Sequence, residues 1–114
     1  MGGNNKESSI IEIFCTSMEF QDLAEATGYG IEEEGIPYRI NFEAIKQGEV
    51  YDICHRNGIG VTIHIDEGVV AVFYRQLKEH KPLFDYHVKE LEIAKTIGKN
   101  AARIIKKKPF IEII

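Results

Sequence analysis

The chain has 114 residues with a hydrophobic fraction of 44% and a charged fraction of 28%, which is ordinary for one soluble globular domain. A formal net charge of -4 at pH 7 argues against a nucleic-acid-binding module, whose surface would be basic and clustered. No apolar run approaches the ~20 residues that cross a bilayer, and the polar residues 2–6 are not typical of a signal peptide. We therefore expect neither a membrane nor nucleic acid as a partner.

Residues 1–8 are polar and are predicted to form a disordered tail, so that a single domain occupies residues 9–114. The segment 9–15 has the β-branched density of a strand. Ser17 is a candidate N-cap for a helix that begins near Glu19.

The apolar side chains of that helix recur at helical spacing on one face: Leu23, Ala24, Thr27 and Ile31. Gly28 and Gly30 interrupt the pattern, and each lowers helix propensity by about 1 kcal/mol relative to alanine. Either they weaken the helix, or they mark a face where another backbone comes close.

A short strand is predicted over residues 37–42, and a mostly helical segment over 42–54 that Gly48 would break. Residues 59–65 alternate as a strand and lead into a tight turn, after which 69–74 return as the second strand of a β-hairpin.

Residues 78–86, around Pro82, are expected to form a loop. An amphipathic helix is predicted from His87 to the lysine run 106–108, where cations suit a helix C-terminus. Its apolar positions are Leu91, Ala94, Ile97, Ala101, Ile104 and Ile105. Its cationic positions, expected to face outward, are Lys95, Lys99 and Arg103.

Pro109 should end this helix, and residues 110–114 read as a last strand. Strands that alternate with helices, together with one hairpin, predict an α/β layered fold with a mixed sheet.

A complete catalytic or nucleotide-binding motif is not found in the sequence. Gly28-Tyr29-Gly30 lacks the third glycine of a dinucleotide-binding fingerprint and lies late in a helix. Cys54 and His55 are neighbours on a helix, about 100° apart, which is poor geometry for a nucleophile and its base. Both cysteines, Cys15 and Cys54, are expected to be reduced core thiols, which indicates a reducing cytoplasm.

The four histidines lack the spacing of metal ligands, and His64 is expected to be a solvated or hydrogen-bonded strand residue. The lysine run 106–108 is either a solvated helix end or an anion site, with the first favoured.

Three consecutive acids, Glu32, Glu33 and Glu34, stand directly before Gly35-Ile36-Pro37, a left-handed cap and stop. Acids at a helix C-terminus oppose the macrodipole. They are either solvated charges or part of a site for a cation from outside the chain. One glutamate alone makes only part of a site for a hard cation.

At this segment the chain resembles the small subunit of the reactivating factor for adenosylcobalamin-dependent diol and glycerol dehydratases. Members of that family carry Gly-apolar-Glu-Glu-Glu/Gln-Gly-apolar-Pro at the end of their first helix, which matches residues 30–37. Further similar blocks lie at 58–60, 82–84, 96–106 and 109–110, so the resemblance covers about residues 20 to 114. The segment 15–20 is shorter than in the family and differs.

The resemblance implies a Rossmann-like α/β layer fold and a chaperone-like role without catalysis. In such factors a large ATPase subunit pairs with the small subunit, and a heterotetramer is expected. The small subunit resembles the dehydratase medium subunit and mimics or displaces it, so that damaged cobalamin leaves. The expected location is the cytoplasm or a bacterial microcompartment.

The resemblance also assigns Glu33 as a ligand of a Mg²⁺ or Ca²⁺ ion shared with the large subunit, whereas this chain itself is expected to bind neither cobalamin nor ATP. The alternatives are a dehydratase medium subunit, which is usually considerably longer, or a small stand-alone α/β enzyme that uses Cys54 or His64.

Overall fold

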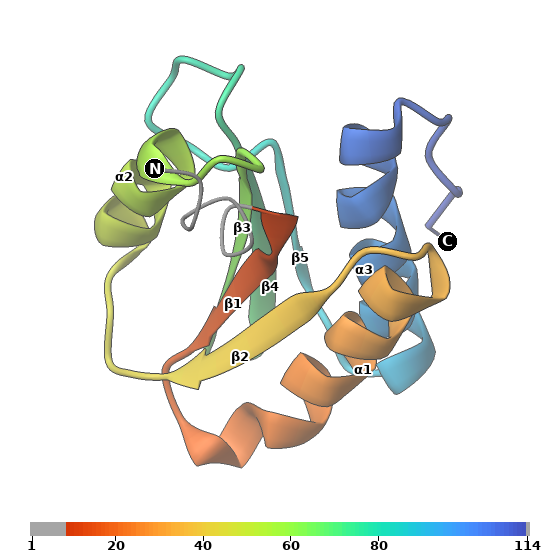
Figure 1. Cartoon of the computed structure of the whole chain (residues 1–114). Coiled ribbons are helices and arrows are strands. Elements are labelled where there is room, and N and C mark those ends of the chain that lie inside the picture. The colour runs from red at the N-terminus through yellow and green to blue at the C-terminus, as the bar shows by residue number, and fades with distance from the viewer. Residues whose placement is uncertain (1–8, 114) are drawn as a thin grey trace.

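The structure, a computed structural model, describes residues 9–113, so the disordered tail predicted over 1–8 lies outside the described residues. Strands and helices alternate along the chain (Figure 1). Their bounds are β1 (Ile11–Cys15), the 3-10 turn η3 (Met18–Phe20), α1 (Gln21–Glu33), β2 (Tyr38–Phe42), α2 (Gln47–Arg56), β3 (Val61–Asp66), β4 (Val69–Tyr74), β5 (Phe84–His87) and α3 (Leu91–Lys106).

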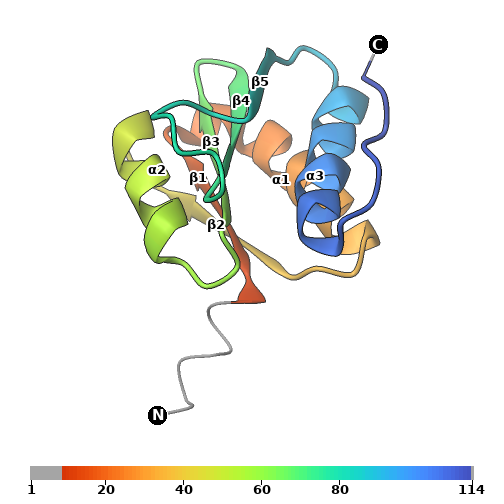
Figure 2. The ribbon, with the colours of Figure 1, turned by 90° about the horizontal axis from the view of Figure 1, so that it is seen from above.

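The five strands form one mixed sheet in the order β2-β1-β3-β4-β5. β1 runs parallel to β2 and β3, whereas β4 is antiparallel to both β3 and β5. Helices α1 and α3 lie together on one face of the sheet and α2 lies on the other (Figure 2). The predicted α/β layered fold with a mixed sheet and a β-hairpin is confirmed.

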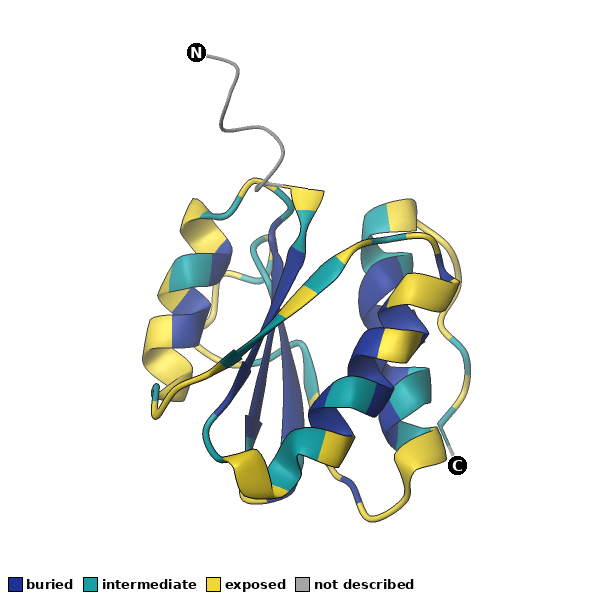
Figure 3. Ribbon diagram, turned by 60° about the horizontal axis from the view of Figure 1, so that its bottom comes forward, coloured by how far each residue is buried: buried dark blue, intermediate teal, exposed yellow. Residues whose placement is uncertain are grey.

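Each face of the sheet has its own apolar core, because side chains alternate along a strand. Ile11 and Ile13 of β1 pack toward α1 and α3 in the larger core, whereas Phe14 packs toward α2 with Val50 and Phe73. The three central strands are almost entirely buried (Figure 3). The sheet therefore forms a rigid support for both helix layers.

Two glycines allow α1 and α3 to approach closely. A Cβ atom on Gly30 would lie 1.9 Å from the carbonyl oxygen of Lys95, and one on Gly98 would lie 1.9 Å from that of Thr27. Gly28 leaves room instead for the ring of Tyr38. The second explanation for the glycines of the first helix, a face where another backbone comes close, is confirmed for Gly30, whereas at Gly28 the close neighbour is a side chain.

The segment predicted as helical over 42–54 begins later than expected. Residues 43–46 have no regular structure, and α2 starts at Gln47. Gly48 does not break this helix. It lies in the first turn with open space around its Cα, and the helix starts there because the Glu49 side chain accepts the backbone N–H of Lys46.

The predictions for the region between the hairpin and α3 were partly wrong. Residues 84–87 form the edge strand β5 rather than a loop, so His87 belongs to a strand and α3 begins at Leu91. Leu91 is 50% exposed and does not join the core. A strand paired with a distant part of the chain carries little local signal, and Phe-Asp-Tyr-His has no β-branched residue.

The last strand predicted over 110–114 is also wrong for the described residues up to 113, which form no strand. The side-chain amide of Asn100 in α3 donates to the carbonyl oxygen of Ile111 at 2.9 Å and accepts its N–H at 2.7 Å. The Asn100 side chain thus hydrogen-bonds both the N–H and the C=O of Ile111, the two groups that would otherwise pair with a neighbouring strand.

The close approach of α1 and α3 predicts that alanine substitutions at two glycines change the free energy of unfolding in opposite directions. Gly98→Ala should lower the free energy of unfolding by about 1–3 kcal/mol, as in other overpacked sites. Gly48→Ala, at an open position of a helix, should raise it by up to about 1 kcal/mol. Urea unfolding of both variants measures this, and equal effects would contradict the described packing.

Candidate functional site

The acidic segment ends α1 in a regular C-terminal cap. The N–H of Ile36 donates to the carbonyl oxygen of Ile31 at 3.3 Å, and the N–H of Gly35 donates to that of Glu32 at 2.9 Å. Gly35 has a φ of +84°, the left-handed conformation expected from the sequence. The chain therefore leaves the helix in a fixed direction, and this cap sets where the three glutamates point.

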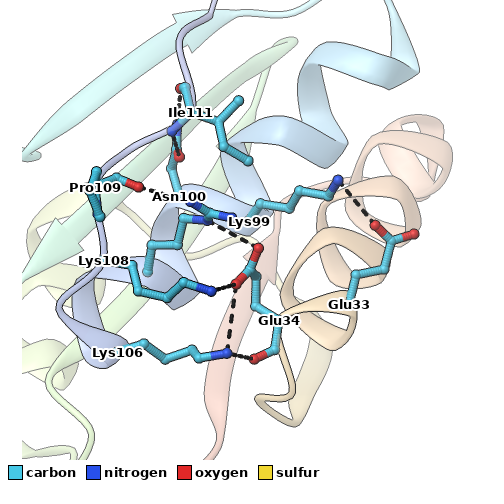
Figure 4. Close-up of polar contacts among 9 residues, drawn as sticks. Glu33, Glu34, Lys99, Asn100, Lys106, Lys108, Pro109 and Ile111 are labelled. Atoms are coloured by element: carbon cyan, nitrogen blue, oxygen red, sulfur yellow. Dashed lines mark hydrogen bonds and ion pairs between the residues drawn. The ribbon is translucent and has the colours of Figure 1, made fainter.

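Glu34 is buried in a cluster of cations from the end of α3 (Figure 4). Its side chain is 9% exposed, with one carboxylate oxygen 3.0 Å from Arg103 Nε and the other 3.4 Å from Lys108 Nζ. Lys106 Nζ donates to the Glu34 carbonyl oxygen at 2.6 Å. Burial raises the pKa of Glu34, but Arg103 and Lys108 outweigh it and leave the pKa below the ordinary value. This cluster locks the end of α1 to the end of α3.

Glu33 points away from that cluster, toward the middle of α3 (Figure 4). One carboxylate oxygen lies 2.8 Å from Lys95 Nζ and the other 3.2 Å from Lys99 Nζ. These two lysines lower the pKa of Glu33, and Glu33 in turn raises the pKa of Lys95. The Glu33 side chain remains 46% exposed, so the ion pairs lie at the surface.

Sequence reasoning missed the role of the cations on α3. Lys95, Lys99 and Arg103 were expected to face solvent, yet they lie half-buried against the end of α1. Their spacing of four residues forms a stripe on a helix, a signal that could have been matched with the acidic triplet. The prediction that the acids are merely solvated is wrong for Glu34.

The lysine run was also expected to be solvated. Residues 106–108 are exposed, as expected, and Lys106 and Lys108 in addition contact Glu34, an anion of this chain.

The other candidate residues have structural roles in the fold. Cys54 is buried, its Sγ lies 3.2 Å from the carbonyl oxygen of Gly60, and burial raises its pKa, which disfavours the reactive thiolate. His55 is exposed, and its ring packs against that of Tyr51 at a tilt of 54°, with ring centroids 4.5 Å apart. The expectation that Cys54 and His55 do not form a catalytic pair agrees with this arrangement.

His64 is 3% exposed, and its Nε2 lies 2.8 Å from the carbonyl oxygen of Ile45. The prediction of a hydrogen-bonded strand histidine is confirmed. Cys15 is also buried and free, as expected of a core thiol.

Residues 9–113 contain no group of three or more His, Cys, Asp or Glu side chains that could hold a metal ion. Glu33, the residue expected to bind a metal, instead contacts Lys95 and Lys99. In the same part of the chain, no helix is long and apolar enough to span a membrane.

The comparison with protein families matches residues 8–111 to the family described as dehydratase medium subunit. The diol dehydratase-reactivating factor small subunit of Klebsiella michiganensis is 35% identical over 89 residues, which cover 74% of this chain and 70% of that protein. The propanediol dehydratase-reactivating factor small subunit of Salmonella typhimurium is 32% identical over 89 residues, covering 74% of this chain and 75% of that protein.

Two solved structures of reactivating factors have a fold similar to that of this chain. A chain of the diol dehydratase-reactivating factor complexed with ADP and Mg²⁺ has a TM-score of 0.78 and 28% identity, covering 90% of this chain and 97% of that chain. A glycerol dehydratase reactivase has a TM-score of 0.79 at 21% identity, covering 91% of this chain and 97% of that chain, and it supports the fold alone.

The buried cluster predicts that Glu34→Gln lowers thermal stability at pH 7, whereas Glu32→Gln, at an exposed position, changes it little. Because the pKa of Glu34 is lowered on folding, the stability it contributes is present above the ordinary glutamate value of about 4.5 and is lost as pH falls through the lowered pKa. The difference between parent and Glu34→Gln should therefore shrink in strong acid. Melting curves from pH 7 to pH 2 test this, and a constant difference would contradict it.

Proposed function

Because the chain belongs to the dehydratase medium subunit family, we propose that it is the small subunit of a factor that reactivates a cobalamin-dependent diol or glycerol dehydratase. One observation carries this proposal. The chain matches the medium-subunit family over almost its whole length, yet the named relatives at 35% and 32% identity are reactivating-factor small subunits.

Shared architecture gives the proposed function a physical basis. A protein with the fold of the dehydratase medium subunit can offer the dehydratase a similar surface and compete for the same place. Such competition shifts the dehydratase from a closed toward an opened state. The size of the shift is set by the difference between the affinities of the competing protein for these two states. In the proposed cycle, damaged cobalamin leaves the opened enzyme.

We assign ATP hydrolysis to a large partner subunit and no catalytic step to this chain. The buried Cys54 supports this assignment, since its Sγ lies 3.2 Å from the carbonyl oxygen of Gly60 and its raised pKa disfavours the reactive thiolate. A heterotetramer with the large subunit, in the cytoplasm or a bacterial microcompartment, is part of the same proposal. The alternatives of a dehydratase medium subunit or a stand-alone enzyme are disfavoured by the names of the relatives.

The proposed contact with the large subunit is the corner at residues 30–37, defined by the C-terminal cap of α1. The contacts between α1 and α3 hold this corner in place, and Glu33 supplies a carboxylate at its surface. Mg²⁺ is commonly held by one or two protein carboxylates together with other oxygen ligands. We propose that Glu33 gives one oxygen to a Mg²⁺ or Ca²⁺ ion shared with the large subunit, which would supply the remaining ligands.

Co-expression with a large ATPase subunit of a diol or glycerol dehydratase-reactivating factor from the same organism tests the proposed function. The two chains should co-elute in size-exclusion chromatography, and the isolated small subunit should hydrolyse no ATP. Failure to co-elute, or ATPase activity of the isolated chain, would overturn the assignment.

The proposed metal ligand is tested by Glu33→Gln, which keeps the side-chain size but removes the charge. Assembly with the large subunit should weaken and lose its sensitivity to a chelator, while the fold measured by circular dichroism stays unchanged. Glu32→Gln, one residue earlier at the same helix end, is the matched control. Equally tight assembly of Glu33→Gln and parent, with and without chelator, would rule out the shared metal.

A further inference from the structure

We propose that the carboxyl ends of β1 and β3 form a binding site for a small zwitterion of the amino-acid type. Its ammonium group would lie toward the end of β3 and its carboxylate toward the start of α2. This site lies outside the corner at residues 30–37, and the inference goes beyond the proposed function. It rests on a cavity, a buried hydrogen-bond acceptor without a partner, and one charge of each sign at the cavity wall.

A cavity of about 390 Å³ opens where β1, β2 and β3 end. It is lined by Thr16, which follows β1, by residues 44–47, which connect β2 to α2, and by His64 and Asp66 of β3. From β1 the chain continues to β2, and from β3 it continues to β4, on the opposite side of this strand pair. In open α/β sheets, ligands bind in the crevice outside the carboxyl ends of strands whose connections diverge in this way.

His64 supplies a buried acceptor at this cavity. The residue is 3% exposed, and its Nε2 lies 2.8 Å from the carbonyl oxygen of Ile45. Because a carbonyl oxygen only accepts, Nε2 of the neutral ring carries the proton and Nδ1 is left as an acceptor. Among residues 9–113, no group donates to Nδ1. An unpaired buried polar group is destabilising, and a donor from a ligand would satisfy it.

The segment that contacts the His64 ring has no regular structure. Residues 43–46 lie between β2 and α2, and Ile45 of this segment accepts the hydrogen bond from Nε2. The ring has almost no exposed surface, so a ligand has to displace part of this segment to reach Nδ1. We therefore expect residues 44–46 to move when the ligand binds.

Asp66 makes this side of the cavity suitable for an ammonium group. The Thr16 hydroxyl donates to one carboxylate oxygen of Asp66 at 2.6 Å and so holds the carboxylate at the end of β3. Asp66 and His64 are two residues apart on one strand, so their side chains lie on the same face of the sheet. An ammonium group has three N–H donors and can serve both acceptors.

The start of α2 suits the carboxylate of the same ligand. The Glu49 side chain already accepts the N–H of Lys46 at 3.0 Å, whereas the N–H groups of Gln47 and Gly48 have no acceptor within the helix. The helix macrodipole favours an anion at this end, and the exposed Lys46 adds a positive charge. A zwitterion therefore complements both sides, while a simple anion would leave the His64 acceptor unpaired.

Titration of the isotope-labelled full-length chain with L-alanine and with L-leucine, followed by NMR, tests the site. The amide signals of residues 44–48 and the ring nitrogen signals of His64 should shift in a saturable manner. Each amino acid has two matched analogues. The amino-acid amide lacks the carboxylate, and the α-hydroxy acid lacks the ammonium group. Both analogues should bind at least about 10-fold more weakly, since each loses one charged hydrogen-bonding group.

His64→Gln keeps a donor for the Ile45 carbonyl oxygen but removes the Nδ1 acceptor, and it should weaken binding roughly 5- to 10-fold. Lys46→Met, at an exposed position, should weaken binding roughly 2- to 5-fold, and it remains informative if His64→Gln folds poorly. His55→Gln is the matched control, because this exposed histidine of α2 does not line the cavity. It should bind the amino acids as the parent does.

The absence of saturable shifts with about 10 mM of either amino acid would overturn the site. Equal binding of the amino acids and their analogues would overturn the zwitterion, and unchanged binding by His64→Gln and Lys46→Met would overturn the assignment to this cavity. These results would leave the proposed function intact, because co-elution with the large subunit is measured separately and without added amino acid.

Discussion

The close contact between α1 and α3 is the constraint on which the rest of the structure depends. Gly30 and Gly98 each face a backbone carbonyl of the opposite helix, so the two helices meet without intervening side chains. This distance brings the acidic end of α1 within reach of the cations of α3. The corner at residues 30–37 is therefore positioned by the glycine contacts together with the ion pairs of Glu34.

The two adjacent glutamates at the end of α1 lie in different surroundings. Glu34 is buried between the ends of α1 and α3, so that its substitution is expected to lower the stability of the fold. Glu33 stays 46% exposed and pairs with Lys95 and Lys99 at the surface. The C-terminal cap separates these roles, because it fixes the direction in which each side chain leaves the backbone. A buried carboxylate and a surface carboxylate thus stand one residue apart.

Elements with strong local periodicity were predictable from the sequence. The buried face of α1, the hairpin of β3 and β4, and the left-handed Gly35 followed from the spacing of apolar residues and turn chemistry. The edge strand β5 was missed because it depends on pairing with β4. The cations of α3 were misplaced because helical periodicity shows which residues share a face, but not what lies opposite. For the same reason, the sequence alone could not distinguish Glu33 from Glu34.

The double hydrogen bond from Asn100 to Ile111 has a consequence for solubility. The C-terminal segment Phe110-Ile111-Glu112-Ile113 has a composition that readily forms intermolecular strands, and β5 is an edge strand of the sheet. Asn100 occupies both the donor and the acceptor of the central residue of this segment, so those groups are unavailable to another chain. The side-chain amide of Asn100 thus holds the backbone of Ile111 against α3, which disfavours its pairing with a strand of another chain.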